Sequence, residues 1–125
     1  MAESSPVDPA ALERLERLGG PEFVRRLIGI FLTEGPKRVA AAEAAFGSRD
    51  GAALAYAAHS LVSSAANVGA AGLAQLARET ERAAERGEWE ALAGPVAALS
   101  GVFAAVSAEL ERALAAAPPG LRAPG

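Results

Sequence analysis

The sequence predicts an all-α protein: an antiparallel up-down four-helix bundle with a short additional N-terminal helix. Large apolar residues recur at alternating steps of three and four along most of the 125 residues, which is the spacing of one buried helix face. No segment alternates apolar and polar residues over the length of a strand, and aromatic residues make up only 5% of the chain, so we expect no sheet. Short turns separate the periodic segments, as between antiparallel neighbours in a bundle.

The first two helices are separated by a pair of glycines. The first is expected from about Pro9 to Leu18, with Asp8 as its N-cap, and Gly19-Gly20 should end it. Pro36 removes one backbone donor from the middle of the second, which opens at Pro21, so we expect one kinked helix there instead of two. The expected buried face of this second helix consists of Phe23, Leu27, Ile30, Phe31, Val39, Ala42 and Phe46.

The remaining three helices show the helical period clearly. The third follows a cap at Asp50, and its expected buried face is Leu54, Ala58, Leu61, Ala65 and Val68. A tight turn within 67–72 leads to the fourth, which ends near Gly87 and should bury Leu73, Leu76, Thr80 and Ala83. The fifth begins around Glu88 and should bury Trp89, Leu92, Val96, Leu99, Phe103, Val106, Leu110 and Ala113.

The folded domain is expected to span 8–116, between a flexible N-terminus at 1–7 and a disordered tail rich in proline and glycine at 117–125. The first residues lack the basic start and the apolar stretch of a signal peptide, so we expect a cytoplasmic protein. Residues 91–108 carry no charge, but their large side chains recur at steps of three and four. That period favours a soluble bundle helix over a membrane span.

Composition argues against several classes of function. The chain has no cysteine, so it forms neither a disulfide nor a thiolate metal site. Its formal net charge is -3 at pH 7, which argues against nucleic acid as the main partner, because phosphate binding needs a basic surface. No glycine-rich phosphate loop is present, so we expect no kinase activity of its own.

The only histidine, His59, is the strongest candidate for a chemical role. At 100° per residue it points roughly 140° away from the expected buried face of its helix, into solvent. The same face carries mostly small side chains, namely Ala52, Ala55, Ser63 and Ala66, with Val62 at its flank. An exposed helix face usually carries long charged residues, so this surface leaves one imidazole accessible to the active site of another protein.

Several chemistries can be compared for this imidazole. A metal site is disfavoured because the chain has no second histidine and no cysteine. General acid–base catalysis needs a carboxylate to orient the ring, and the neighbouring positions hold Val62 and Ser63 instead. A serine nucleophile paired with His59, either Ser60 or Ser63, would need an oxyanion hole that no pattern indicates. A histidine that itself accepts a phosphoryl group fits best, and an exposed histidine without a function stays open.

The segment around His59 resembles the histidine-containing phosphotransfer (HPt) domain of multistep two-component phosphorelays. The family pattern reads approximately A-H-x-L-K-G-S-S-A-N-x-G-A. The matching residues are Ala58, His59, Leu61, Ala66, Asn67, Val68, Gly69 and Ala70, and Ser64 and Ala65 fall on the paired small positions. The helices before and after this segment also resemble those of the family, so the similarity extends from about Val7 to Leu114.

The resemblance implies a phosphorelay carrier, not an enzyme. His59 would accept a phosphoryl group from the aspartate of a response-regulator receiver domain and pass it to another, in a relay fed by a hybrid histidine kinase. The chain would bind no cofactor, and Mg²⁺ is expected on the partner receiver domain. We expect a monomer with a partner surface formed by Ala52, Ala55, Val62, Ser63 and Ala66. Candidates to steer the partner are Lys37, Arg38, Arg78 and Arg82.

Two positions depart from the family pattern. The family usually has lysine three residues after the histidine, where this chain has Val62, and glycine at the fourth, where it has Ser63. Val62 cannot donate a hydrogen bond to a phosphoryl group, whereas the hydroxyl of Ser63 can. We therefore expect phosphorylated His59 to be less stabilised here, unless arginine or lysine from another helix or from the partner compensates.

Other functions stay open. A pseudo-HPt domain would bind a receiver or a kinase without being phosphorylated, and the missing lysine favours it. A helical adaptor would use the small-residue face to dock another helix, without any need for the histidine. An acid–base enzyme is the weakest of these hypotheses, because the sequence shows neither a converging carboxylate nor a pocket.

Overall fold

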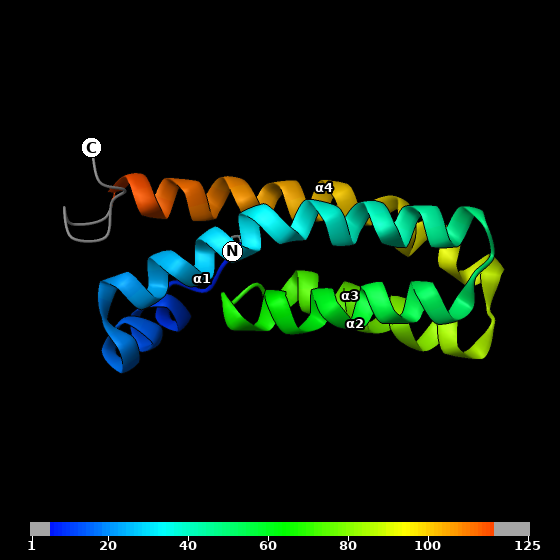
Figure 1. Ribbon diagram of the computed structural model, residues 1–125, viewed down its shortest axis with the longest axis horizontal. Helices are drawn as coiled ribbons and strands as arrows, with labels where there is room; N and C mark the ends of the chain where they lie inside the picture. Colours follow the sequence, from blue (N-terminus) through cyan, green and yellow to red (C-terminus); the bar gives the residue numbers. More distant parts are fainter. Residues whose placement is uncertain (1–5, 117–125) are drawn as a thin grey trace, which may run out of the picture.

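The computed structural model describes residues 6–116 as four helical elements joined by short turns. They are α1 (Pro9–Gly47), α2 (Gly51–Asn67), α3 (Ala71–Arg86) and α4 (Trp89–Ala116). The ribbon shows them lying along one long axis, with successive elements antiparallel (Figure 1). No residue within 6–116 belongs to a strand, so the predicted all-α bundle is confirmed. The predictions for residues 1–5 and 117–125 lie outside the described residues.

α1 consists of two helical arms that meet at Gly20. Gly20 has φ 86° and ψ 174°, a conformation that favours glycine, and the chain bends sharply there (Figure 1). The first arm is the predicted short N-terminal helix, which Asp8 caps by accepting from the backbone N–H of Ala10 at 3.0 Å. The backbone N–H of Asp8 also donates to the carbonyl of Gly69 at 2.9 Å. This arm therefore covers the turn between α2 and α3.

The second arm of α1 buries part of the predicted face, because Phe31, Val39 and Ala42 are buried as expected. Of the other predicted residues, Ile30 is 52% exposed, and three are half-buried: Phe23, Leu27 and Phe46. The residues buried on this arm are Val24, Ile28, Phe31, Gly35, Val39, Ala42 and Ala45. The prediction was wrong at Ile30 because it followed the large side chains, whereas the observed face passes through Gly35, where a Cβ would overlap the ring of Phe103.

The second arm also continues through Pro36 without interruption. Gly20 is the only residue of α1 with non-helical φ and ψ, so Pro36 sits inside helical backbone. The prediction of one helix across Pro36 is therefore confirmed, and the break at Gly20 falls at the glycine pair that was expected to end the first helix.

The predicted faces of the other helices form the centre of the core. All five predicted residues of α2 are buried, as are six of the eight in α4: Leu92, Val96, Leu99, Phe103, Val106 and Leu110. Trp89 and Ala113 are half-buried, and in α3 only Leu76 is partly exposed among the predicted four. Phe103 of α4 stacks on Phe31 of α1 with ring centroids 4.7 Å apart, which joins the first and last helices.

α4 is long and apolar enough to cross a membrane by length and composition alone. Its large side chains, however, lie in the bundle core, and between residues 91 and 105 its exposed positions are alanine, glycine and serine. A core helix of a soluble protein passes the same test, so this helix is weak evidence for a membrane protein.

Candidate functional site

α2 fixes the position of His59. Asp50 caps the helix by accepting from the backbone N–H of Ala53 at 3.0 Å, and the buried side chains on the opposite face set its rotation. The side chain of His59 is 65% exposed and points away from the core, as the helical register predicts. The imidazole is therefore accessible from solvent.

By the helical register, the five residues of the predicted partner surface share the His59 side of α2, at different depths of burial. Ala52, Ser63 and Ala66 are exposed, whereas Ala55 and Val62 are half-buried and pack against the core. α2 carries no charged residue between Gly51 and Asn67. The side chains near His59 on its own helix are thus mostly short, and a partner surface can approach the ring closely.

Tyr56 is the exception to this short surface, and the sequence analysis missed it. Its side chain is one of three exposed large hydrophobic ones in the described part of the chain, with 68% exposure. It lies three residues before His59, which places it about 60° away around the helix. The helical register that places the alanines beside His59 also places Tyr56 there.

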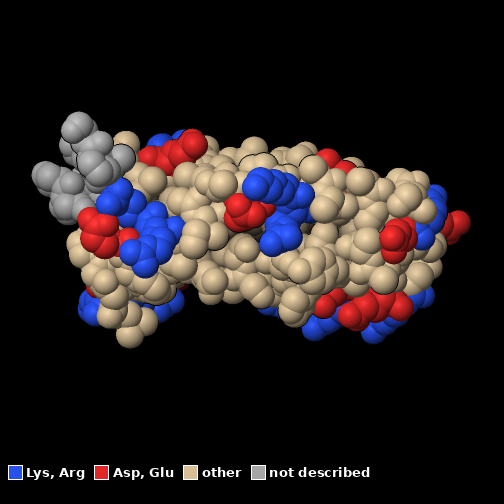
Figure 2. All heavy atoms as spheres, viewed as in Figure 1, with Lys and Arg blue, Asp and Glu red and all other residues tan. Residues whose placement is uncertain are grey.

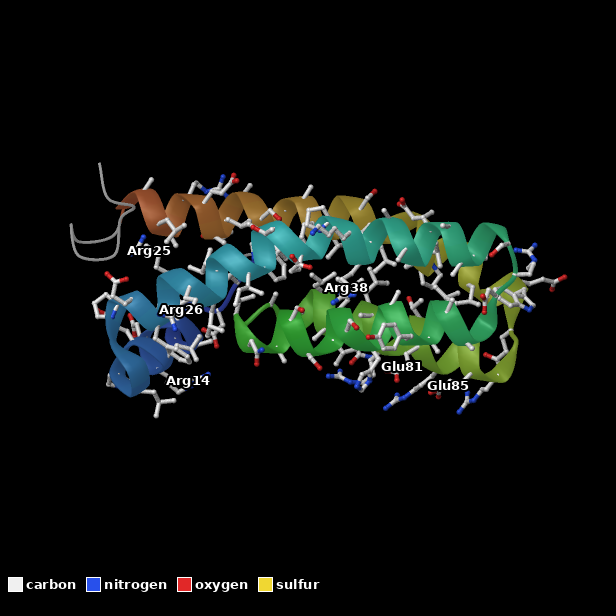
Figure 3. All side chains as sticks on the ribbon, in the orientation of Figure 1. Arg14, Arg25, Arg26, Arg38, Glu81 and Glu85 are labelled. Atoms are coloured by element: carbon white, nitrogen blue, oxygen red, sulfur yellow. The ribbon has the colours of Figure 1, made fainter. Side chains whose placement is uncertain are left out.

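A carboxylate from another helix meets the imidazole. Oε2 of Glu81, on α3, lies 3.0 Å from Nδ1 of His59, and the Glu81 side chain is 21% exposed. In Figure 3, Glu81 lies beside the overlapping ribbons of α2 and α3. The expectation that no carboxylate orients the ring was therefore wrong. It considered positions one turn along the same helix, and the partner comes from the neighbouring one.

The contact with Glu81 determines which nitrogen of the neutral ring carries the proton. An ionised carboxylate only accepts hydrogen bonds, so the neutral imidazole meets Glu81 with Nδ1–H as the donor. The lone pair of the ring then resides on Nε2, the nitrogen that Glu81 does not contact. The arrangement prepares Nε2 as a nucleophile.

The two positions that depart from the family pattern offer different groups to a ligand. Val62 is half-buried and apolar, so it offers no donor. Ser63 is exposed, and its hydroxyl has no hydrogen-bond partner among the described residues, whereas the hydroxyls of Ser60 and Ser64 donate to backbone carbonyls. Ser63 is therefore free to donate to a group bound at His59.

The basic residues predicted to steer a partner come from α1 and α3 and differ in their contacts. Lys37 pairs with Glu34 at 3.4 Å, and Arg78 donates to the side chain of Gln75 at 3.1 Å. Arg82 is exposed and Arg38 is half-buried. The space-filling view shows charged side chains in separate groups, with broad uncharged surface between them (Figure 2).

The site is a surface and not a cavity. A hollow of about 800 Å³ lies at the end of the bundle where Val7 meets α3 and α4, and His59 does not line it. No three His, Asp or Glu side chains within residues 6–116 gather closely enough to hold a metal ion. An exposed nucleophile of this kind suits a reaction in which the partner protein provides the pocket.

Comparison with known proteins defines the class. The Hpt domain family model matches residues 26–117, so the chain belongs to the histidine-containing phosphotransfer domains. Among solved structures, it is similar to histidine-containing phosphotransfer protein B (HptB) from Pseudomonas aeruginosa PAO1. The two share 26% sequence identity and a TM-score of 0.81, over 88% of this chain and 95% of the other. No sequence among the curated proteins matches the chain.

Proposed function

We propose that Nε2 of His59 accepts a phosphoryl group from the aspartyl phosphate of a receiver domain and returns it to the aspartate of another. The membership of the family supports a phosphorelay carrier in general terms. The observation that carries the finer assignment is the pair of His59 and Glu81, in which Glu81 contacts Nδ1 and no described residue forms a hydrogen bond with Nε2.

The proposed phosphoryl transfer does not require a proton to leave the imidazole ring of His59. The lone pair of Nε2 attacks phosphorus, the bond between phosphorus and the aspartyl oxygen breaks, and the aspartate leaves as a carboxylate. The ring keeps its Nδ1–H and becomes positively charged, and Glu81 stabilises that charge through the same hydrogen bond. The reverse transfer uses the same groups, so the carrier works in both directions.

The remaining parts of the reaction are assigned to the partner. We assign Mg²⁺ to the receiver domain and no cofactor to this chain, which acts as a monomeric carrier in the cytoplasm without kinase activity of its own. A hybrid histidine kinase, through its receiver domain, is the proposed source of the phosphoryl group. The surface that contacts the receiver domain consists of Ala52, Ala55, Val62, Ser63 and Ala66.

The test is the transfer itself. Receiver domains charged with labelled acetyl phosphate are incubated with the chain, and we expect a label on it that is labile in acid and stable in base. The variant His59→Gln should keep its helical circular dichroism and lose all label. A label that persists in His59→Gln, or acid-stable labelling, would contradict the assignment of His59.

A pseudo-HPt domain that binds a receiver or a kinase without being phosphorylated is the second candidate, because Val62 offers no donor where the family usually has lysine. It predicts that charged receivers bind the chain but leave no label on it. In that case the His59→Gln variant should bind the receiver as well as the wild type does, which a binding titration measures.

A further inference from the structure

A second hollow, of about 410 Å³, lies where the first arm of α1 meets the end of α2 and the start of α3. Two arginines line this arginine hollow, Arg14 from the arm and Arg78 from α3. Asp8 lines it as well, but its carboxylate already accepts from the backbone N–H of Ala10. In Figure 3, Arg14 lies on the first arm, at the end of the bundle that this arm covers. The hollow therefore carries more positive than negative charge.

Neither arginine of the hollow has a carboxylate partner. Within residues 6–116, Arg14 forms no ion pair or hydrogen bond, and Arg78 donates only to the neutral side chain of Gln75, at 3.1 Å. Arg25 and Arg112 differ, because each pairs with a glutamate three residues away on its own helix, at 2.6 and 2.7 Å. Arg14 and Arg78 are thus available to an anion from outside the chain.

The first arm is fixed against the turn between α2 and α3, so Arg14 has a defined place. The backbone N–H of Asp8 donates to the carbonyl of Gly69 at 2.9 Å, and Ala11 is buried. Gly69 has φ 76°, and a Cβ on it would lie 2.5 Å from the Cβ of Ala11, so the arm approaches the turn closely. Arg14 follows Ala11 by three residues, which places both on one side of the arm.

The arginine hollow is continuous with the predicted partner surface. Ala66 belongs to that surface and also lines the hollow, about 10 Å along α2 from His59. On α3, Arg78 lies about one turn before Glu81, the residue that contacts the imidazole. A stable interface covers about 800 Å² of each partner, which corresponds to a patch of about 16 Å in radius. A receiver domain centred on His59 therefore reaches the hollow.

We propose that the arginine hollow binds an acidic side chain of the receiver domain, beside the site of phosphoryl transfer and separate from it. The inference rests on the proposed function, which makes a receiver domain the partner. A guanidinium is suited to a carboxylate because its planar donors contact both oxygens. Arg14 precedes residues 26–117, which match the family model, so its contact adds selectivity to the common part of the domain.

The test is the affinity for a receiver domain, measured by calorimetry with the wild type and with His59→Gln, so that binding is read with and without the acceptor. Arg14→Ala should raise the Kd about three- to tenfold in both backgrounds, the effect of one charge-assisted contact in an interface. The rate of label transfer at saturating receiver should stay at the wild-type value, because the hollow does not contact the phosphorus atom.

Two further variants make the result specific. Arg17→Ala removes the same charge from an exposed position of the same arm that does not line the hollow, so it should leave the Kd unchanged. Arg78→Gln removes the second cation and should also weaken binding, and the double variant of Arg14 and Arg78 should weaken it further. Thermal unfolding of each variant should show that the bundle is intact.

The outcomes separate this inference from the proposed function. If the wild type takes up no label and Arg14→Ala still weakens binding, His59 fails as the acceptor and the arginine hollow remains part of the docking surface. If the wild type is labelled and Arg14→Ala binds with the wild-type Kd, the role of the hollow alone is wrong. An equal loss of affinity in Arg17→Ala would also overturn it, because general attraction by the charge of the arm would explain both. Slower transfer at saturation in Arg14→Ala would contradict a role in docking alone.

Discussion

Oε2 of Glu81 lies 3.0 Å from Nδ1 of His59, and the two residues belong to different helices. The acceptor nitrogen of the proposed reaction is therefore prepared by the packing of α3 against α2 and not by α2 alone. Because Glu81 is only 21% exposed, the contact is partly shielded from water, which strengthens a hydrogen bond to a charged ring. The packing of the helices thus determines which nitrogen of His59 is bound by Glu81.

Replacing Glu81 with glutamine should slow phosphoryl transfer to His59 by about tenfold, which corresponds to about 1.4 kcal/mol of lost stabilisation of the charged ring. The amide keeps the shape of the side chain but loses its negative charge. The measurement is the rate of label transfer from a charged receiver. Glu85→Gln is the matched control, because Glu85 is exposed and lies one turn further along the same helix. If both variants slow transfer equally, general surface charge is responsible and not the contact with His59.

Tyr56 should contribute to the affinity for the receiver domain and not to the chemistry. An exposed aromatic side chain beside a surface of small residues can fill a pocket on a partner, and such anchors dominate many interfaces. Tyr56→Ala should weaken binding about tenfold, as measured by calorimetry, with little change in thermal stability. Ile30→Ala is the control, because Ile30 is also an exposed large residue but lies on α1. Unchanged affinity in Tyr56→Ala would show that the receiver docks elsewhere.

The short side chains beside His59 should be needed for access. Ala66→Gln adds a long neutral side chain about 20° from His59 around the helix, two turns along, and should lower the transfer rate at least tenfold by steric exclusion. Ala53→Gln adds the same side chain about 120° away, also at an exposed position, and should have little effect. Comparable rates in both variants would mean that the receiver does not contact this face.

Periodicity predicted those parts of the molecule in which large apolar residues alone define a helix face. In α2 and α4, Leu54, Leu61, Leu92 and Leu99 are fully buried, as expected. The exposure of His59 follows from the same register, because a residue opposite a fixed buried face must point to solvent.

Periodicity of a single helix could not predict contacts between helices. Glu81 reaches His59 because α3 lies beside α2 at a particular rotation and height, and neither quantity is encoded in the spacing along one helix. The buried face of α1 was misjudged for a related reason. Gly35 is buried because a ring from α4 occupies the space above it, so its burial depends on a residue 68 positions away, Phe103.

The close approach of α1 and α4 at Gly35 gives a stability prediction with an internal control. A Cβ at Gly35 would overlap the ring of Phe103, so Gly35→Ala should force α1 and the Phe103 ring of α4 apart. We expect it to lower the free energy of unfolding by about 1–3 kcal/mol, the usual cost of overpacking a core. The urea midpoint should fall accordingly.

Gly29→Ala provides the comparison, because Gly29 lies on the same helix and a Cβ there meets nothing within 4 Å. Alanine has the higher helix propensity, so this variant should be as stable as the wild type or more stable by up to about 1 kcal/mol. The two variants change the same atoms in the same helix, and only the neighbour differs. If Gly35→Ala were as stable as Gly29→Ala, the packing of Phe103 onto α1 would be looser than the stacked contact with Phe31 at 4.7 Å indicates.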